Sequence, residues 1–329
     1  MKKFSIIVLM IVSALGVKAQ SRKNIANYSL VQQYFNPALT GIEGSRLKTL
    51  FRDQWTGFDQ APRTIFASGE LDLNQLKWSK NRGSAESETE YRLASNGSHA
   101  FGLSLLLDQF GPLQQNQVNI SYATGVRLSE KFSLRLGGAL TYEASKLNPN
   151  KMTLDGENDP EYTDLMMSDN NQAKKLDANI GVVVAAEDYY LGYAMQDIAR
   201  GQVISNNNIL QNMYPRQHVV QAGYRQGITD QFGLVVNGIY RYDNKVKETV
   251  EGQLKGVFNN TFWAGAGYRH DLAFTFLGGV QLNQFRVGYV REMTSGKANG
   301  ITSSTNELMF TYNLIPVKHE KQTRKITIW

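Results

Sequence analysis

A regular alternation of apolar and polar side chains, in segments of about ten residues, most constrains what this chain can fold into. Between 118 and 128 the apolar residues Val118, Ile120 and Tyr122 alternate with polar or small ones, and the pattern returns between 132 and 142. Successive side chains of a strand point to opposite faces, so each segment predicts a strand with one apolar face. Two such strands joined by a short turn predict a hairpin.

The same pattern recurs along the chain and predicts about fourteen strands. Their expected starts are roughly 47, 63, 99, 117, 132, 178, 189, 216, 232, 247, 261, 273, 285 and 306. Strands of about nine to twelve residues exceed the five or six that are usual in soluble sheets. We therefore expect an all-β fold, a transmembrane antiparallel β-barrel with apolar side chains toward lipid and polar ones toward the lumen. A soluble secreted sandwich or propeller is the alternative, since its strands alternate too.

The predicted connections differ in length. Short ones fall at 129–131, 186–188, 228–231, 243–246, 270–272 and 283–284, and long ones at 74–98, 144–177, 197–215 and 293–305. Barrels of this kind have short periplasmic turns and longer outer loops, so we expect the long connections outside the cell. Aromatic residues at strand ends predict girdles at both lipid–water interfaces: Tyr142, Tyr193, Tyr224, Tyr240, Tyr242, Tyr268 and Tyr289.

The first nineteen residues predict a cleaved export signal. Lys2 and Lys3 precede an apolar run over 4–17, and Val17-Lys18-Ala19 predicts cleavage before Gln20. A membrane anchor is the alternative, but the run is shorter than the roughly twenty residues that span a bilayer. After it there is no long apolar run, so the mature chain is expected to be either soluble outside the cytoplasm or a β-barrel.

Composition excludes several classes of function. The chain has no cysteine, which excludes thiolate metal sites, cysteine nucleophiles, disulfides and a lipidated cysteine. The formal charge falls from +6 to +3 once Lys2, Lys3 and Lys18 are removed, and no block of like charges is present. We therefore expect no nucleic-acid partner.

Catalytic and cofactor motifs are not found, so we expect neither an enzyme nor a cofactor. The four histidines lie far apart without the spacing of a zinc site. Some outer-membrane enzymes use a Ser/His pair at the barrel rim. Ser98, His99 and His218 are the candidate residues for such a pair, but their spacing in the sequence does not support it.

An acidic run is the one weak candidate for a metal site, because calcium accepts several carboxylates from one loop. It comprises Asp155, Glu157, Asp159, Glu161 and Asp164. Pro160 stands where an EF-hand needs glycine and Met166 where it needs glutamate. A solvated outer loop is therefore the preferred interpretation.

The stretch 32–73 carries a more specific signature. It contains Phe35-Asn36-Pro37-Ala38, then Arg52-Asp53-Gln54-Trp55, then Gly57-Phe58 and Ala61-Pro62-Arg63-Thr64. This resembles the opening of the PorP/SprF family of type IX secretion outer-membrane proteins of Bacteroidetes, where an FNPA element precedes R-x-Q-W and GF…AP-x-T elements. Weaker similarities follow at 218–224, 262–269 and 285–289, so the resemblance spans most of the mature chain.

The resemblance implies a component of the cell outer membrane, a fourteen-stranded barrel akin to fatty-acid transporter barrels. Members of the family support secretion, surface retention or gliding motility through a secreted adhesin-like cargo. The implied partners are outer-membrane lipid, type IX secretion components and that cargo. The alternatives are a passive transporter of hydrophobic or small solutes and, from another class, a soluble secreted protein that binds glycans.

We accordingly divide the chain into a signal peptide (1–19), an N-terminal lumen or plug segment (20–46), the barrel (47–314) and a periplasmic tail (315–329). Candidate contacts with a plug or partner are Asn36, Pro37, Arg52, Gln54, Trp55 and Phe58. The Asn-Pro pair initiates a turn that would fold the N-terminal segment into the barrel mouth. Arg52, Gln54 and Trp55 are expected early in the first strand, with Arg52 and Gln54 facing the lumen. Plain structural packing is the alternative role for all six.

The tail after the last predicted strand is basic, with Lys318, Lys321, Arg324 and Lys325. It would either dock on the secretion apparatus or remain a flexible extension. Three apolar residues, Ile326, Ile328 and Trp329, are unusual in a purely solvated tail.

Overall fold

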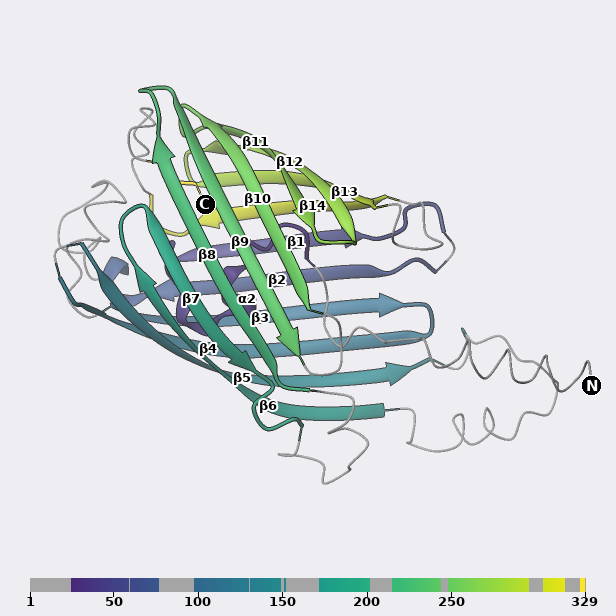
Figure 1. Ribbon diagram of the computed structural model, residues 1–329. Helices are drawn as coiled ribbons and strands as arrows, with labels where there is room; N and C mark the ends of the chain where they lie inside the picture. Colours follow the sequence, from purple (N-terminus) through teal and green to yellow (C-terminus); the bar gives the residue numbers. More distant parts are fainter. Residues whose placement is uncertain are drawn as a thin grey trace, which may run out of the picture.

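Fourteen antiparallel strands form one closed barrel in the computed structural model (Figure 1). The strands are β1 (Arg46–Asp53), β2 (Arg63–Asp72), β3 (Ser98–Phe110), β4 (Leu113–Arg127), β5 (Ser133–Leu147), β6 (Gln172–Ala185), β7 (Tyr189–Gln196), β8 (Gln217–Gly227), β9 (Phe232–Asp243), β10 (Thr249–Phe258), β11 (Phe262–Arg269), β12 (Ala273–Leu282), β13 (Phe285–Thr294) and β14 (Thr305–Asn313). Each strand pairs with its sequence neighbours, and β1 pairs with β14 to close the wall.

The structure describes residues 25–58, 60–76, 98–129, 131–148, 151, 172–201, 215–243, 248–295, 304–316 and 326–328. Within these ranges, no helix is long and apolar enough to cross a membrane.

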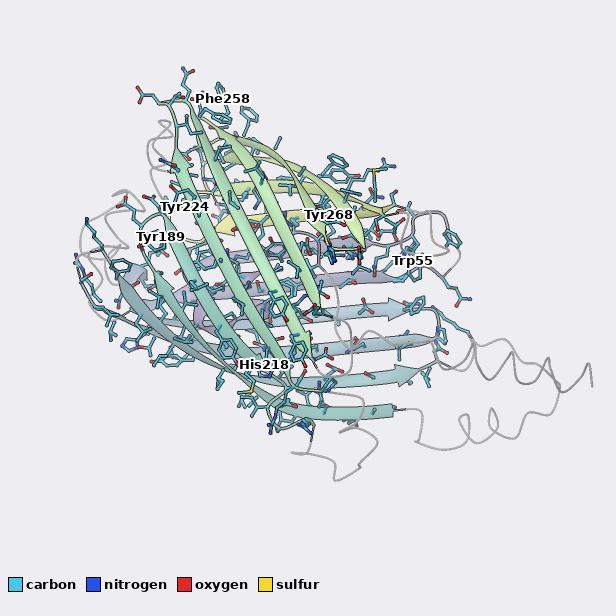
Figure 2. The ribbon with its side chains drawn as sticks, in the orientation of Figure 1. Trp55, Tyr189, His218, Tyr224, Phe258 and Tyr268 are labelled. Carbon is cyan, nitrogen blue, oxygen red and sulfur yellow. The ribbon has the colours of Figure 1, made fainter. Side chains whose placement is uncertain are left out.

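The side-chain alternation confirms the barrel fold. On β3, the outward Leu103, Leu105 and Leu107 are exposed, whereas the inward Ser104 and Leu106 between them are buried. Aromatic side chains mark both rims in Figure 2: Tyr189, Tyr224 and Phe258 near one, and Trp55, His218 and Tyr268 near the other. An outer face made of large apolar side chains is unsuited to water and suited to lipid.

All fourteen predicted strands are present, and most of the predicted starts lie within two residues of the observed ones. The two larger differences are β4, which begins at Leu113, and β6, which begins at Gln172. After Leu113, β4 continues with four polar residues (114–117), and β6 begins with Gln172, Ala173, Lys174 and Lys175. These residues do not alternate between apolar and polar, so the pattern does not reveal where the two strands begin. β6 also extends beyond its neighbour, because it pairs with β7 only through Ile180–Ala185.

We call the end of the barrel where β1 begins and β14 ends the termini end, and the other the opposite end. The links at the termini end are 73–97, 128–132, 186–188, 228–231, 259–261 and 283–284. Those at the opposite end are 54–62, 111–112, 148–171, 197–216, 244–248, 270–272 and 295–304. The prediction that all long links share one end is wrong for 73–97, and the short links 244–248 and 270–272 lie among the long ones. Antiparallel strands alternate in direction. A link that follows an even-numbered strand therefore lies at the termini end, and one that follows an odd-numbered strand lies at the opposite end, whatever its length.

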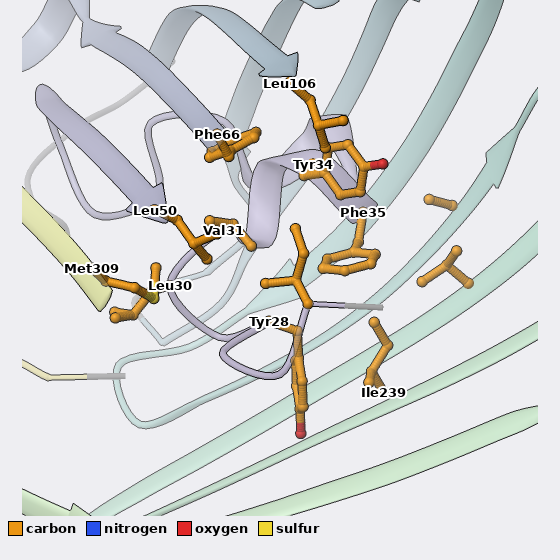
Figure 3. Close-up of a cluster of buried hydrophobic side chains, with 13 residues drawn as sticks. Tyr28, Leu30, Val31, Tyr34, Phe35, Leu50, Phe66, Leu106, Ile239 and Met309 are labelled. Atoms are coloured by element: carbon orange, nitrogen blue, oxygen red, sulfur yellow. The ribbon is translucent and has the colours of Figure 1, made fainter. Parts of the chain in front are cut away.

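The segment 25–45, which we call the plug, lies inside the barrel (Figure 1). It contains a short helix α2 (Gln32–Phe35) and a 3-10 turn η1 (Pro37–Leu39). Figure 3 shows its apolar side chains packed against the inner wall: Tyr28, Leu30, Val31, Tyr34 and Phe35 meet Leu50, Phe66, Leu106, Ile239 and Met309. The hydrophobic core of this protein is therefore the contact between plug and wall.

The end of the chain also reaches the lumen. Ile326 and Ile328 are buried in an apolar cluster that includes Val235 and Val257 of β9 and β10. The amide of Thr327 donates to Asn260 Oδ1 in the β10–β11 turn at 3.2 Å. Residues 326–328 thus pack against the inner wall beside this turn, where the two isoleucines gain apolar burial.

A charge placed on the lipid face tests the membrane assignment of the wall. Leu105→Arg, in the middle of β3, should destabilise the barrel by about 2–4 kcal/mol, and Leu128→Arg beside the rim by at most about 1 kcal/mol. The measurement is urea unfolding in lipid, followed by the heat-modifiable shift in gel migration. Equal, small effects at both positions would show that water rather than lipid lies against β3.

Candidate functional site

The six predicted contact residues fall into two groups. Asn36, Pro37 and Arg52 are buried in the lumen, whereas Gln54, Trp55 and Phe58 lie in the β1–β2 link at the opposite end. Arg52 is the penultimate residue of β1 and so lies late in the strand, contrary to expectation. Gln54 follows the strand and is half-buried, and its backbone amide continues the ladder to β2 by donating to Pro62 O at 2.9 Å.

Arg52 closes the seam of the barrel. It stands opposite Glu307 in the β1–β14 register, and its guanidinium donates to the Glu307 carboxylate and to Glu292 at 3.2 Å. The same Glu307 carboxylate accepts the backbone amides of Ala26 at 2.7 Å and Asn27 at 2.9 Å. One buried carboxylate thus joins the two edge strands of the wall to the plug.

The charges continue around the inner wall. Glu292 also pairs with Arg269 at 3.0 Å, and Arg269 donates to Glu251 at 2.8 Å. All these side chains are at least nine-tenths buried. A buried charge is tolerated only when it is paired and hydrogen-bonded, so removal of one member leaves its neighbours uncompensated.

The Asn36-Pro37 pair sits on a floor of glycines. Asn36 Oδ1 accepts the amide of Ala38 at 3.0 Å and so caps η1. A Cβ added to Gly181 would overlap the Asn36 side chain, and one added to Gly137 would overlap the backbone at Ala38. The plug can approach the wall this closely only because these strand positions carry no side chain.

The floor is a row of small residues across five strands. Ladder pairing places them in one line: Ala100, Ala123, Gly137, Gly181 and Ala194. None of these residues stands out in the sequence as part of a site. Each is unremarkable alone, and the row becomes visible only when strand register is known.

Polar side chains from the wall hold the plug backbone. Arg135 donates to the carbonyl of Ala38 at 3.0 Å and to that of Thr40 at 2.7 Å. Gln196 Nε2 donates to the carbonyls of Tyr34 and Phe35, each at 2.9 Å. These bonds satisfy buried carbonyls that the short helical turns leave open.

The β1–β2 link, which we call the outer loop (54–58 and 60–62), is fixed in place at the opposite end. Thr56 N donates to Ser304 O at 3.1 Å, and Asn306 Nδ2 donates to Thr56 Oγ1 at 2.9 Å. Trp55 has a positive φ of 51° and packs edge-on against Phe110, with ring centroids 5.5 Å apart. Phe58 is 57% exposed. The loop therefore presents two aromatic side chains from an ordered backbone.

The candidate Ser/His pair is not assembled. Ser98 faces the lumen, where Arg135 donates to its hydroxyl at 2.8 Å, whereas His99 faces outward against the Tyr122 hydroxyl at 2.7 Å. His218 is likewise outward, 2.7 Å from the Tyr193 hydroxyl. The acidic run with Asp155, Glu157 and Asp159 lies outside the described residues, and among those described no group of three potential ligands is found.

A closed antiparallel barrel with an apolar outer face and aromatic rims defines an outer-membrane β-barrel protein. The family model of the type IX secretion system membrane protein PorP/SprF matches residues 17–312. The chain therefore belongs to the PorP/SprF family and resides in the outer membrane. No curated protein matches the sequence.

Solved structures with a similar fold are distant. The toluene transporter TbuX of Ralstonia pickettii has 10% identity and a TM-score of 0.47, over 85% of this chain and 92% of that one. Omp33 of Acinetobacter baumannii has 6% identity and a TM-score of 0.44, over 82% and 96%. A FadL homologue of Pseudomonas aeruginosa has 9% identity and a TM-score of 0.42, over 82% and 90%. Likenesses at this level carry no argument about function.

Loss of the seam carboxylate should destabilise the barrel. Glu307→Gln leaves Arg52 without its register partner, and breaking a buried pair costs about 3–5 kcal/mol. The exposed Glu248, which accepts the Tyr240 hydroxyl at 2.9 Å, offers the control Glu248→Gln. Thermal unfolding in detergent should separate the two variants, and coincident midpoints would contradict the assigned role of Glu307.

Filling the glycine floor should displace the plug without harming the wall. Gly181→Val puts a side chain where Asn36 lies, whereas Gly252→Val adds one at a lipid-facing position with nothing within 4 Å. We expect protease to cut within 25–45 in the first variant and to spare this segment in the second. Resistance of the plug in both would mean that the floor does not hold it.

Proposed function

We propose that this protein is a non-enzymatic component of type IX secretion that supports the secretion or surface attachment of an adhesin-like partner. The observation that carries the proposal is the filled lumen. Glu307 holds the plug near the opposite end, the glycine floor holds it near the termini end, and 326–328 pack beside the β10–β11 turn. A barrel whose lumen is occupied by its own chain at these levels is better suited to binding a protein than to passing a solute.

The rival function, passive transport, needs a route through the lumen or a gap in the wall. The step where β6 extends past β7 is the place to look for such a gap. There, Asp177 accepts the amides of Ala199 and Gly201, each at 2.8 Å, and Ile198 N donates to Ala178 O at 3.1 Å. Within the described residues this edge of β6 is covered, which favours the secretion role over transport.

The outer loop offers the partner-binding surface. Interface hot spots are enriched in aromatic side chains held by a rigid scaffold. Trp55 and Phe58 meet that description at the opposite end, the end expected to face outside the cell. The buried Asn36, Pro37 and Arg52 would then act indirectly, by keeping the barrel filled and its seam closed.

Removing the two aromatics tests the proposal. In Trp55→Ala/Phe58→Ala, barrel abundance should stay normal, whereas partner display on the cell surface should fall tenfold or more, since a hot-spot truncation costs about 2 kcal/mol or more. The matched control is Phe132→Ala/Tyr189→Ala, another edge-on pair with centroids 6.0 Å apart, located at the termini end.

Flow cytometry with an antibody to the displayed partner gives the readout. Normal display in the outer-loop variant, or equal loss in both variants, would overturn the assignment of this surface.

A further inference from the structure

The outer face of the barrel carries the same tyrosine–histidine pair twice. His99 Nδ1, at the second position of β3, lies 2.7 Å from the Tyr122 hydroxyl. His218 Nδ1, at the second position of β8, lies 2.7 Å from the Tyr193 hydroxyl. In both pairs the rings are stacked with their centroids 6.1 Å apart. Because β3 begins at the termini end and β8 at the opposite end, the two pairs lie at different rims of the wall (Figure 2).

The pair at the opposite end is part of a larger group. Tyr242 stands opposite His218 in the β8–β9 register with ring centroids 6.3 Å apart, so three rings lie side by side. Arg216 is exposed on the same outward side, two residues before His218, and its Nε donates to Ile198 O at 2.9 Å. Its two terminal amino groups have no hydrogen-bond partner among the described residues. We call Arg216, His218, Tyr193 and Tyr242 the rim cluster.

The rim cluster lies where the apolar outer face ends. The next outward residues toward the middle of the wall are Leu191 and Val220, both apolar and exposed. Barrels of this type keep their termini and short turns in the periplasm, which puts the opposite end in the outer leaflet. The rim cluster is therefore expected at the level of the outer-leaflet headgroups, where aromatic rings with polar tips are favoured.

We propose that the rim cluster binds the phosphorylated sugar headgroup of an outer-leaflet glycolipid. The planar guanidinium of Arg216 matches two oxygens of a phosphate. If the Tyr193 hydroxyl donates to Nδ1 of His218, the ring proton lies on Nε2, which is then a second donor. The exposed tyrosine rings offer flat apolar faces on which the C–H groups of a sugar ring can pack. Phosphate and sugar are thus each matched by side chains of one surface.

The charges around the rim cluster favour an anion. Asp197 and Asp243, at the ends of β7 and β9, are buried, and Glu248 accepts the Tyr240 hydroxyl at 2.9 Å. Within the described residues, no carboxylate forms an ion pair with Arg216. The adjoining links 202–214 and 244–247 contain two lysines and no acidic residue. A phosphate at this rim would therefore meet cations without displacing a carboxylate from them.

The pair at the termini end is the natural comparison. Thr124 stands opposite His99 in the β3–β4 register, whereas Tyr242 stands opposite His218. The Thr124 hydroxyl lies 3.3 Å from His99 Nδ1. The tyrosine–histidine pair is thus shared by the two rims, whereas the third ring is found only beside His218. A role in packing alone would be common to both pairs.

Native mass spectrometry of the purified full chain in detergent tests the proposal with three probes: bisphosphorylated lipid A, lipid A without its phosphates, and phosphatidylglycerol. Arg216→Gln/His218→Phe removes the charge and the ring donor but keeps similar side-chain size. The control at the other rim is Arg127→Gln/His99→Phe, because Arg127 Nε also donates to a backbone carbonyl, that of Ser129 at 3.0 Å. Heat-modifiable gel migration verifies that each variant is folded.

We expect the unmodified chain and the control to retain bisphosphorylated lipid A, and the rim-cluster variant to retain it at least about tenfold less, since hydrogen bonds to a charged group are the strong ones. Both other probes should bind the unmodified chain more weakly. Equal retention by the two variants would overturn the proposal. Phosphatidylglycerol bound as well as lipid A, or no lipid A retained by the unmodified chain, would overturn it without reference to any variant.

Discussion

One buried carboxylate links the wall of this barrel to its contents. Glu307 meets Arg52 where the last strand joins the first, and it accepts two amides from the plug. A charge inside a lumen away from water is stable only when such partners are present. Closure of the barrel and binding of the plug are therefore energetically coupled, because the buried Glu307 carboxylate is stabilised by Arg52 across the seam and by the two plug amides together.

Elsewhere in the lumen, too, polar groups of the wall are paired with those of the plug. The wall lines its interior with Arg, Glu, Gln and Asn, and the plug brings backbone groups that need partners. Arg135 and Gln196 satisfy plug carbonyls, while glycines in β5 and β6 let the plug come close enough for this to happen. The result is a barrel whose lumen holds the plug, and this is the basis for our proposal that partner recognition falls to surfaces such as the outer loop.

The fold was largely predictable because lipid and lumen impose opposite polarity on alternate residues, which leaves a period-two pattern in the sequence. The pattern failed at the starts of β4 and β6, where the residues do not alternate between apolar and polar. The pattern also does not show at which end of the barrel a link lies. The long link 73–97 follows the second strand and therefore lies at the termini end, contrary to the prediction from its length. The buried positions of Ile326 and Ile328 depend on contacts with distant strands. In the sequence they are visible only as apolar residues in an otherwise basic tail.

The site was predictable only in part. The motif around Asn36 and Arg52 drew attention to residues that prove to be buried, but their roles depend on Glu307, Gly137 and Gly181, which lie far away in sequence. Predicting such contacts requires the register of all the strands between these residues, and no local sequence pattern encodes that register.

Hydrogen–deuterium exchange of the purified protein in lipid nanodiscs tests the central claim most directly. If the plug is bound to the seam and to the glycine floor, peptides covering 25–45 should exchange as slowly as those from the barrel strands. Exchange of this segment within seconds, at the rate of an unstructured peptide, would contradict a filled lumen and the account built on it.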